Sequence, residues 1–112
     1  MKTYIALFEY EAGKPGYGVV FPDLPGCISA GDDYADAFRM AHEALALYAD
    51  SEDRLPEPRS LEEIKATWEA WPEWEQQYQF QVAQIRLYPL AEAVKLCSEK
   101  AFAIAVSRTF MS

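Results

Sequence analysis

The 112-residue sequence has no asparagine, one histidine and two cysteines, and each shortage excludes a class of protein or site. Without asparagine there is no N-glycosylation sequon. Cys27 and Cys97 stand alone in the chain and form no C-x-x-C pair, so the sequence suggests neither a disulfide framework nor a zinc site. We expect both to be free thiols, buried or half-buried, in a reducing cytoplasm.

Basic residues are also scarce. Ten Lys and Arg stand against eighteen Asp and Glu, which gives a net charge of −8 and an isoelectric point near 4.5. Contact with nucleic-acid phosphates requires clustered Lys and Arg, so this composition disfavours unaided nucleic-acid binding. The same charge suits a basic protein partner, whose approach it would accelerate, although solubility alone is the simpler explanation.

Long hydrophobic runs are absent as well. The apolar start of the chain is interrupted by Glu9 and Glu11, so we expect neither a secretory signal nor a membrane span. The single histidine, His42, is followed at the fourth position by Ala46, and therefore lacks the second ligand of a helical zinc motif. We interpret His42 as a solvated side chain on the polar flank of a helix, and we predict no metal and no cofactor.

The first third of the chain reads as three antiparallel strands. Lys2–Tyr10 carries apolar residues at both parities, which is typical of a central strand covered on both faces. Tyr17–Phe21 and Cys27–Ala30 are extended patterns joined by Asp23–Gly26, whose Pro and Gly preset turn dihedrals.

Helical patterns follow these strands. An amphipathic helix is predicted from Tyr34 to about Asp50, with Asp33 as its N-cap. Ser60 and Glu63 form a capping box, which predicts a short helix over Leu61–Ala70 that ends before Pro72. The apolar parity then switches between Val82 and Ile85, so a strand with a β-bulge near Ala83 and Gln84 is expected.

The tail from Pro89 onward has two readings. Leu90, Val94, Cys97 and Ala101 fit one face of a single helix, whereas Val94–Cys97 followed by a Ser98 cap fits a short strand and then a helix. We expect a helix over Ala91–Phe110 that packs on its own domain or on a neighbouring subunit.

The stretch Tyr17–Asp33, YGVVFPDLPGCISAGDD, with the amphipathic helix after it, resembles the antitoxin component of the HicA/HicB toxin–antitoxin family. The resemblance covers Met1–Asp50 by motif and Ser51–Leu87 by the order of elements. It implies an α/β (α+β) fold, a truncated RNase H-like domain with a three- to four-stranded antiparallel sheet on one main helix, a short second helix and a helical tail. The expected division is residues 1–88 for this domain and 89–112 for a tail that starts like a truncated ribbon-helix-helix.

The resemblance implies an antitoxin, a binding protein and not an enzyme, that neutralises a small basic mRNA-cleaving HicA-type toxin by occluding its RNA-binding surface. RNase H-like nucleases place an aspartate in the middle of the first strand, and this chain has Ile5, Ala6 and Leu7 there. Operon autoregulation through the tail is a family expectation, but three cations after Pro89 and the missing second helix predict weak DNA binding. The alternative is an orphan regulatory or scaffold domain of the same fold.

Three groups of residues are candidates for toxin contact. They are the turn, the acidic residues before and along the main helix, and an aromatic cluster: Asp23, Leu24 and Pro25; Asp32, Asp33, Asp36 and Glu43; Trp68, Trp71 and Trp74. Each group also has a structural explanation, since a turn can simply bend the chain and tryptophans can close a second core. Exposed strand edges and the aromatic excess further predict a homodimer or higher homo-oligomer.

Overall fold

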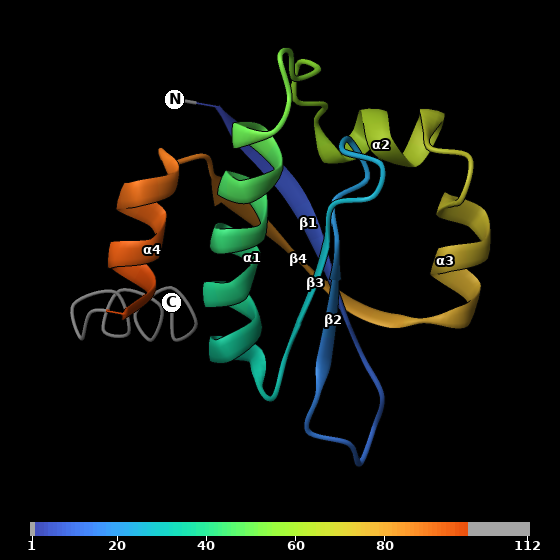
Figure 1. Ribbon diagram of the computed structural model, residues 1–112. Coiled ribbons are helices and arrows are strands. Elements are labelled where there is room, and N and C mark those ends of the chain that lie inside the picture. The colour runs from blue at the N-terminus through green and yellow to red at the C-terminus, as the bar shows by residue number, and fades with distance from the viewer. Residues whose placement is uncertain (1, 99–112) are drawn as a thin grey trace.

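The structure is a computed structural model that describes residues 2–98 of the chain. Within them, four antiparallel strands form one sheet in the order β3-β2-β1-β4 (Figure 1). The strands are β1 (Thr3–Tyr10), β2 (Tyr17–Val20), β3 (Ile28–Gly31) and β4 (Gln79–Arg86). The expected antiparallel α/β sheet is therefore confirmed, with β1 in its interior.

Four helices complete the described part of the chain. They are α1 (Tyr34–Asp50), α2 (Leu61–Thr67), α3 (Trp71–Gln77) and α4 (Leu90–Ser98). Helix α1 packs along the sheet with α4 beside it, and α2 and α3 lie away from this pair, on the other side of the strands (Figure 1). None of the helices in residues 2–98 has the length and apolar character needed to cross a membrane.

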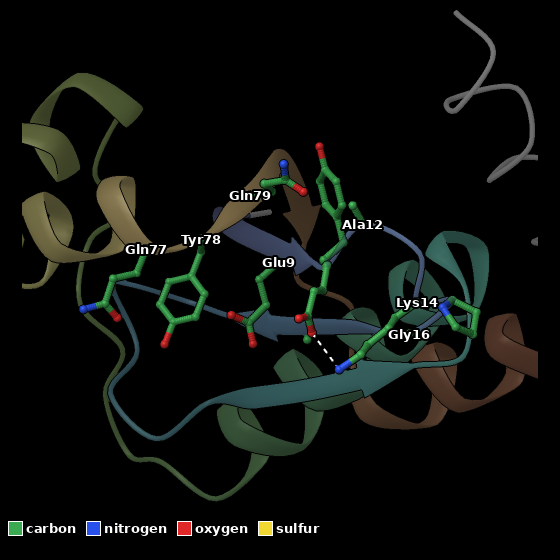
Figure 2. A pocket seen from close by; sticks show the side chains of 11 residues that line it. Glu9, Ala12, Lys14, Gly16, Gln77, Tyr78 and Gln79 are labelled. Carbon is green, nitrogen blue, oxygen red and sulfur yellow. Dashed lines mark ion pairs between the residues drawn. The ribbon is translucent and has the colours of Figure 1, made fainter.

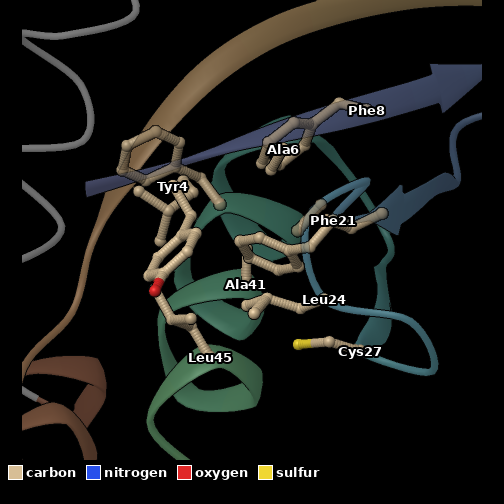
Figure 3. Packing of buried hydrophobic residues seen from close by; sticks show 12 residues of the cluster. Tyr4, Ala6, Phe8, Phe21, Leu24, Cys27, Ala41 and Leu45 are labelled. Atoms are coloured by element: carbon tan, nitrogen blue, oxygen red, sulfur yellow. The ribbon is translucent and has the colours of Figure 1, made fainter. Parts of the chain in front are cut away.

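The main core lies between α1 and the sheet (Figure 3). Tyr4, Ala6 and Phe8 of β1 alternate toward the helix, where they meet Phe38 and Leu45. The rings of Phe8 and Phe38 stack with their centroids 6.2 Å apart. Burying large aromatic side chains of this kind contributes about 2–3 kcal/mol each, so this face contributes strongly to stability.

A second core covers the opposite face of β1. Ile5 and Leu7 pack against Ile64 of α2 and Trp71, the first residue of α3, and Phe80 of β4 borders them. The apolar residues at both parities of β1 thus correspond to two separate cores, as the sequence pattern indicated.

Both predicted helix caps are present. The Asp33 carboxylate accepts a hydrogen bond from the Asp36 amide at 2.8 Å, and α1 begins at Tyr34, directly after Asp33. Ser60 and Glu63 exchange side-chain bonds with each other's backbone amides at 3.1 and 3.2 Å, which is the complete capping box. These local bonds explain why the starts of both helices were predictable.

The predicted β-bulge in β4 is wrong. Strand β4 pairs with β1 in unbroken register from Thr3 with Arg86 to Tyr10 with Gln79. Ile85 faces the main core, whereas Phe80 and Val82 share the other face with Leu7. The apolar parity switches because the strand faces two cores along its length, and no inserted residue is needed.

The predicted helix over Leu61–Ala70 is also too long. Helix α2 ends at Thr67, and a helix that the sequence reading missed, α3, begins at Trp71. Pro72 lies in the first turn of α3. A proline is tolerated there because the backbone N–H groups of the first turn have no acceptor within the helix. The same residue that was interpreted as a stop signal therefore starts the next helix.

The tail begins as a helix, so the alternative of a strand over Val94–Cys97 is wrong. Helix α4 packs against α1, with Ala93 buried between them. The remainder of the helix expected up to Phe110 lies outside the described residues. The division at residue 89, and the comparison with a truncated ribbon-helix-helix, stay predictions.

Candidate functional site

The turn between β2 and β3 is fastened to the start of α2 by an ion pair. The Asp23 carboxylate accepts the backbone N–H of Arg59 at 2.9 Å and also the Arg59 Nε–H. Arg59 additionally donates to the Thr67 hydroxyl at 2.8 Å and to the Pro22 carbonyl at 3.2 Å. Only 2% of the Asp23 side chain is exposed, so this candidate residue holds the turn in place, and its contact with a toxin stays a prediction.

The other turn candidates divide between inside and outside. Leu24 is fully buried in the main core, and its neighbour Pro25 is exposed. Tyr48 of α1 donates a hydrogen bond to the Pro25 carbonyl at 3.1 Å, and Gly26 follows with a φ of +87°. The side chain available to a partner in this turn is therefore that of Pro25.

Acidic side chains gather where β3 leads into α1. Asp32 and Asp33 are exposed, and Asp36 is half-buried and paired with Arg39. The pKa of Asp36 is lowered, first by the hydrogen bond from the Asp32 amide and then by the bond from Arg39. Glu43 is half-buried further along the helix. Asp32 and Asp33 offer the most accessible negative charges of this group.

The three tryptophans close the second core. Trp71 is only 6% exposed and meets Phe80 edge to face, with the ring centroids 5.5 Å apart. Trp68 and Trp74 are half-buried around it and lie 5.8 Å from each other. Their role in packing is thus explained, and contact of Trp68 and Trp74 with a partner stays a prediction.

A groove that the sequence reading missed lies beside the second core, between the β1–β2 hairpin and the end of α3. It has a volume of about 860 Å³, and Figure 2 shows the Glu9 side chain in it, between Tyr78 and Lys14. Lys14 is paired with Glu11 at 3.0 Å. Among the described residues, no hydrogen bond or ion pair engages the Glu9 carboxylate, which is therefore available to a cation.

Gly18 makes room for Glu9 in this groove. The two residues are register partners on adjacent strands, and a Cβ atom added to Gly18 would lie 2.6 Å from the Glu9 carboxylate. Ala30 on β3 is the register partner of Gly18, so the row of Glu9, Gly18 and Ala30 crosses the sheet to its edge. A Gly opposite a Glu on neighbouring strands was the sequence signal that could have indicated this groove.

His42 is buried, which corrects its interpretation as a solvated side chain. Its Nδ1–H donates to the Phe38 carbonyl at 2.9 Å, and its ring lies 4.9 Å from that of Phe38. Burial lowers the pKa of His42, and the backbone bond opposes this shift only in part. The residue holds a core position near Tyr88, because α4 and its connection cover a helix flank that the sequence pattern left open.

The thiol of Cys27 is held in its unreactive, protonated form. Cys27 is buried, and burial raises the pKa of its thiol to about 11, which suppresses the reactive thiolate. The side chain of Cys97 lies outside the described residues. No group of three His, Cys, Asp or Glu side chains is placed to hold a metal ion in the described part.

Comparison with known proteins identifies the family. A family model described as the HicB_like antitoxin of bacterial toxin-antitoxin systems matches residues 4–106. The chain is 36% identical over 57 residues to an uncharacterized 14.9 kDa protein of Haemophilus phage HP1, strain HP1c1, from the rep-hol intergenic region. That match spans 47% of this chain and 43% of the phage protein.

Solved structures share the fold. The crystal structure of the Burkholderia pseudomallei antitoxin HicB superposes with a TM-score of 0.59 at 24% identity, over 79% of this chain and 63% of that one. A HicB chain in the HicA3 and HicB3 toxin-antitoxin complex gives 0.59 at 21% identity, over 78% and 99%. Since the family model covers nearly the whole sequence, the chain belongs to the HicB-like antitoxin family of bacterial toxin–antitoxin systems.

Proposed function

We propose that this chain is an antitoxin that binds a small basic HicA-type toxin and blocks its RNA-binding surface. The observation that carries the proposal is the unpaired Glu9 carboxylate in an open groove of a chain whose net charge is −8. An RNA-binding surface is basic because it contacts phosphates, so a carboxylate-lined groove can take the place of the RNA. The membership of the chain in an antitoxin family supports the same role.

The charged surface extends beyond the groove. Asp32 and Asp33 are exposed just after β3, whose Ala30 is the register partner of Gly18 in the groove. We assign toxin contact to Glu9, Asp32, Asp33 and the exposed Pro25. Asp23 and Leu24 act indirectly in this scheme, because they fix the turn from the inside.

The chain acts in this scheme as a cytoplasmic binding protein with an RNase H-like core that does not cleave RNA. The middle of β1 holds Ile5, Ala6 and Leu7, which are buried and apolar where a nuclease of that type needs a carboxylate. Homo-oligomerisation and regulation of its own operon complete the proposal, and the acidity of the chain predicts that DNA binding by it alone is weak.

The binding part of this proposal is tested with the product of any HicA-type reading frame next to this chain's gene, purified with an inactivating substitution. Titration calorimetry should give a stoichiometric complex whose affinity falls steeply with salt. Glu9→Gln should weaken binding about tenfold, the loss of about one charge-assisted contact. Glu62→Gln, on the exposed face of α2 outside the groove, is the matched control and should bind as the unaltered chain does. No heat of binding at any salt concentration would contradict the proposal.

A further inference from the structure

Strand β3 is a short edge strand with backbone groups directed away from the sheet. The Phe21 amide donates to the Cys27 carbonyl at 3.3 Å, and the antiparallel register continues from Val20 with Ile28 to Tyr17 with Gly31. Because alternate residues of an antiparallel strand face the same neighbour, Cys27, Ser29 and Gly31 bond toward β2. The N–H and C=O groups of Ile28 and Ala30 therefore point outward.

The outward edge ends at a defined position. The Asp32 amide, which would be the next outward donor, is already held by the Asp36 carboxylate at 2.9 Å. Two residues, Ile28 and Ala30, thus present an N–H and C=O pair each, which is the number that a short added strand uses. No backbone partner of these groups exists within residues 2–98.

An exposed apolar side chain lies on one face of this edge, and α1 covers the other face. Ile28 is 68% exposed on the face of the second core, at the end of a row that runs through Val20 and Leu7. On the other face, α1 lies along β3, as shown by the 3.8 Å contact of the Cys27 sulfur with the Ala44 carbonyl. An added strand would cover Ile28 with one of its alternating residues.

The charge around β3 selects the occupant. Asp32 and Asp33 stand exposed at the end of the strand. A second copy of this chain would bring the same acidic residues, on a chain of charge −8, to the same edge. The other edge strand, β4, carries Gln81, Gln84 and Arg86 and has no acidic residue within its own span. A basic segment therefore fits β3, and a second copy does not.

We propose that β3 binds an extended basic segment of the toxin by strand addition, with main-chain bonds to Ile28 and Ala30. The inference rests on the proposed antitoxin function and specifies how the complex is held. Main-chain bonds supply the affinity in this mode of recognition, and the pockets for alternate side chains supply selectivity. Lys or Arg side chains of the segment would reach Asp32 and Asp33, and an apolar side chain would cover Ile28.

Amide hydrogen exchange of the complex with the inactivated toxin tests the main-chain bonds directly. Exchange at Ile28 and Ala30 should slow at least about tenfold on binding, because both amides become bonded. Val82 and Gln84, whose amides point outward from β4 and which do not line the groove, are the matched controls and should exchange as in the free chain. Unchanged exchange at Ile28 and Ala30 in a formed complex would overturn the proposal.

Two pairs of variants test the same edge by affinity. Ala30→Pro removes an outward donor, and Ile28→Arg adds repulsion of a basic segment at an exposed position; each should raise the Kd about tenfold or more. Gln84→Pro and Val82→Arg place the same changes on β4 and should leave the Kd unchanged. If all four variants bind the toxin with the Kd of the unaltered chain, strand addition is overturned but the antitoxin proposal stands. If the unaltered chain does not bind the toxin at all, both proposals are overturned. A free dimer that Ala30→Pro dissociates would assign the edge to a second copy instead.

Discussion

Asp23 and Arg59 form one ion pair, but removing Arg59 should destabilise the fold more than neutralising Asp23 does. Arg59→Ala deletes the guanidinium bonds to Asp23, Thr67 and Pro22, and leaves a carboxylate that is only 2% exposed. Leaving a buried charge unpaired costs about 3–5 kcal/mol, and we take about 3 because the Arg59 amide still bonds to it. At about 4–8 °C per kcal/mol for a domain of this size, the melting temperature should fall by about 12–24 °C.

Asp23→Asn should cost less. The side chain of Arg59 is 29% exposed, so it keeps Thr67 and Pro22 as acceptors and regains water after the carboxylate is neutralised. We expect a loss of about 1–2 kcal/mol in the free energy of unfolding. Adding Asp23→Asn to Arg59→Ala should restore part of the stability, since the buried charge then disappears.

Urea denaturation followed by circular dichroism measures all three variants against the unaltered chain. We expect Arg59→Ala to lose the most free energy of unfolding, and the double variant to be less destabilised than Arg59→Ala alone. Equal losses below about 0.5 kcal/mol for both single variants would show that the turn is held by its apolar residues and not by this ion pair.

Three further predictions concern other parts of the fold. Gly31→Ala should destabilise by about 2–3 kcal/mol in urea denaturation, because its Cβ would lie 2.2 Å from the Ala37 amide nitrogen, whereas Gly18→Ala meets only the flexible Glu9 side chain and should cost less than about 1 kcal/mol. Burial lowers the pKa of His42 below 6.5, so its contribution to stability is complete above pH 6.5 and is lost as the pH falls. The free energy of unfolding of His42→Leu should therefore change less between pH 7 and 5 than that of the unaltered chain. Identical slopes of this free energy against pH for the two proteins would refute the prediction. The purified chain should leave RNA and RNA–DNA hybrids intact with magnesium or manganese, and metal-dependent cleavage that survives repurification would contradict the binding role.

The elements with local signals were predictable from the sequence. Helix α1 starts after Asp33 and ends at Asp50 as expected, because its cap and its apolar stripe lie within the same segment. The central position of β1 also followed from its own residues, since apolar side chains at both parities need cover on both faces.

Features that depend on distant partners were not predictable in this way. The register of β4 could not be read from its own pattern, because Phe80 and Ile85 belong to cores made by different helices. His42 is buried by a connection and a helix that arrive more than forty residues later. Local reading also failed at Pro72, which is compatible with both the end of one helix and the first turn of the next.

The candidate site residues also differ in whether their position depends on local or on distant contacts. Exposure of Asp32 and Asp33 was predictable because both belong to a turn and a cap. The burial of Asp23 was not, since its partner Arg59 lies 36 positions away and nothing in the turn itself indicates it. The Glu9 groove needs the pairing of β1 with β2 and the position of α3, so it appears only in the folded chain.

The central claim is that this chain neutralises a toxin ribonuclease by covering its RNA-binding surface. The direct measurement is the rate at which an active HicA-type toxin from a reading frame next to this gene cleaves a labelled RNA, as purified chain is added. We predict that cleavage falls linearly with added chain and stops near one antitoxin chain per toxin, and that Glu9→Gln needs a higher concentration. An unchanged cleavage rate in the presence of excess folded chain would contradict it.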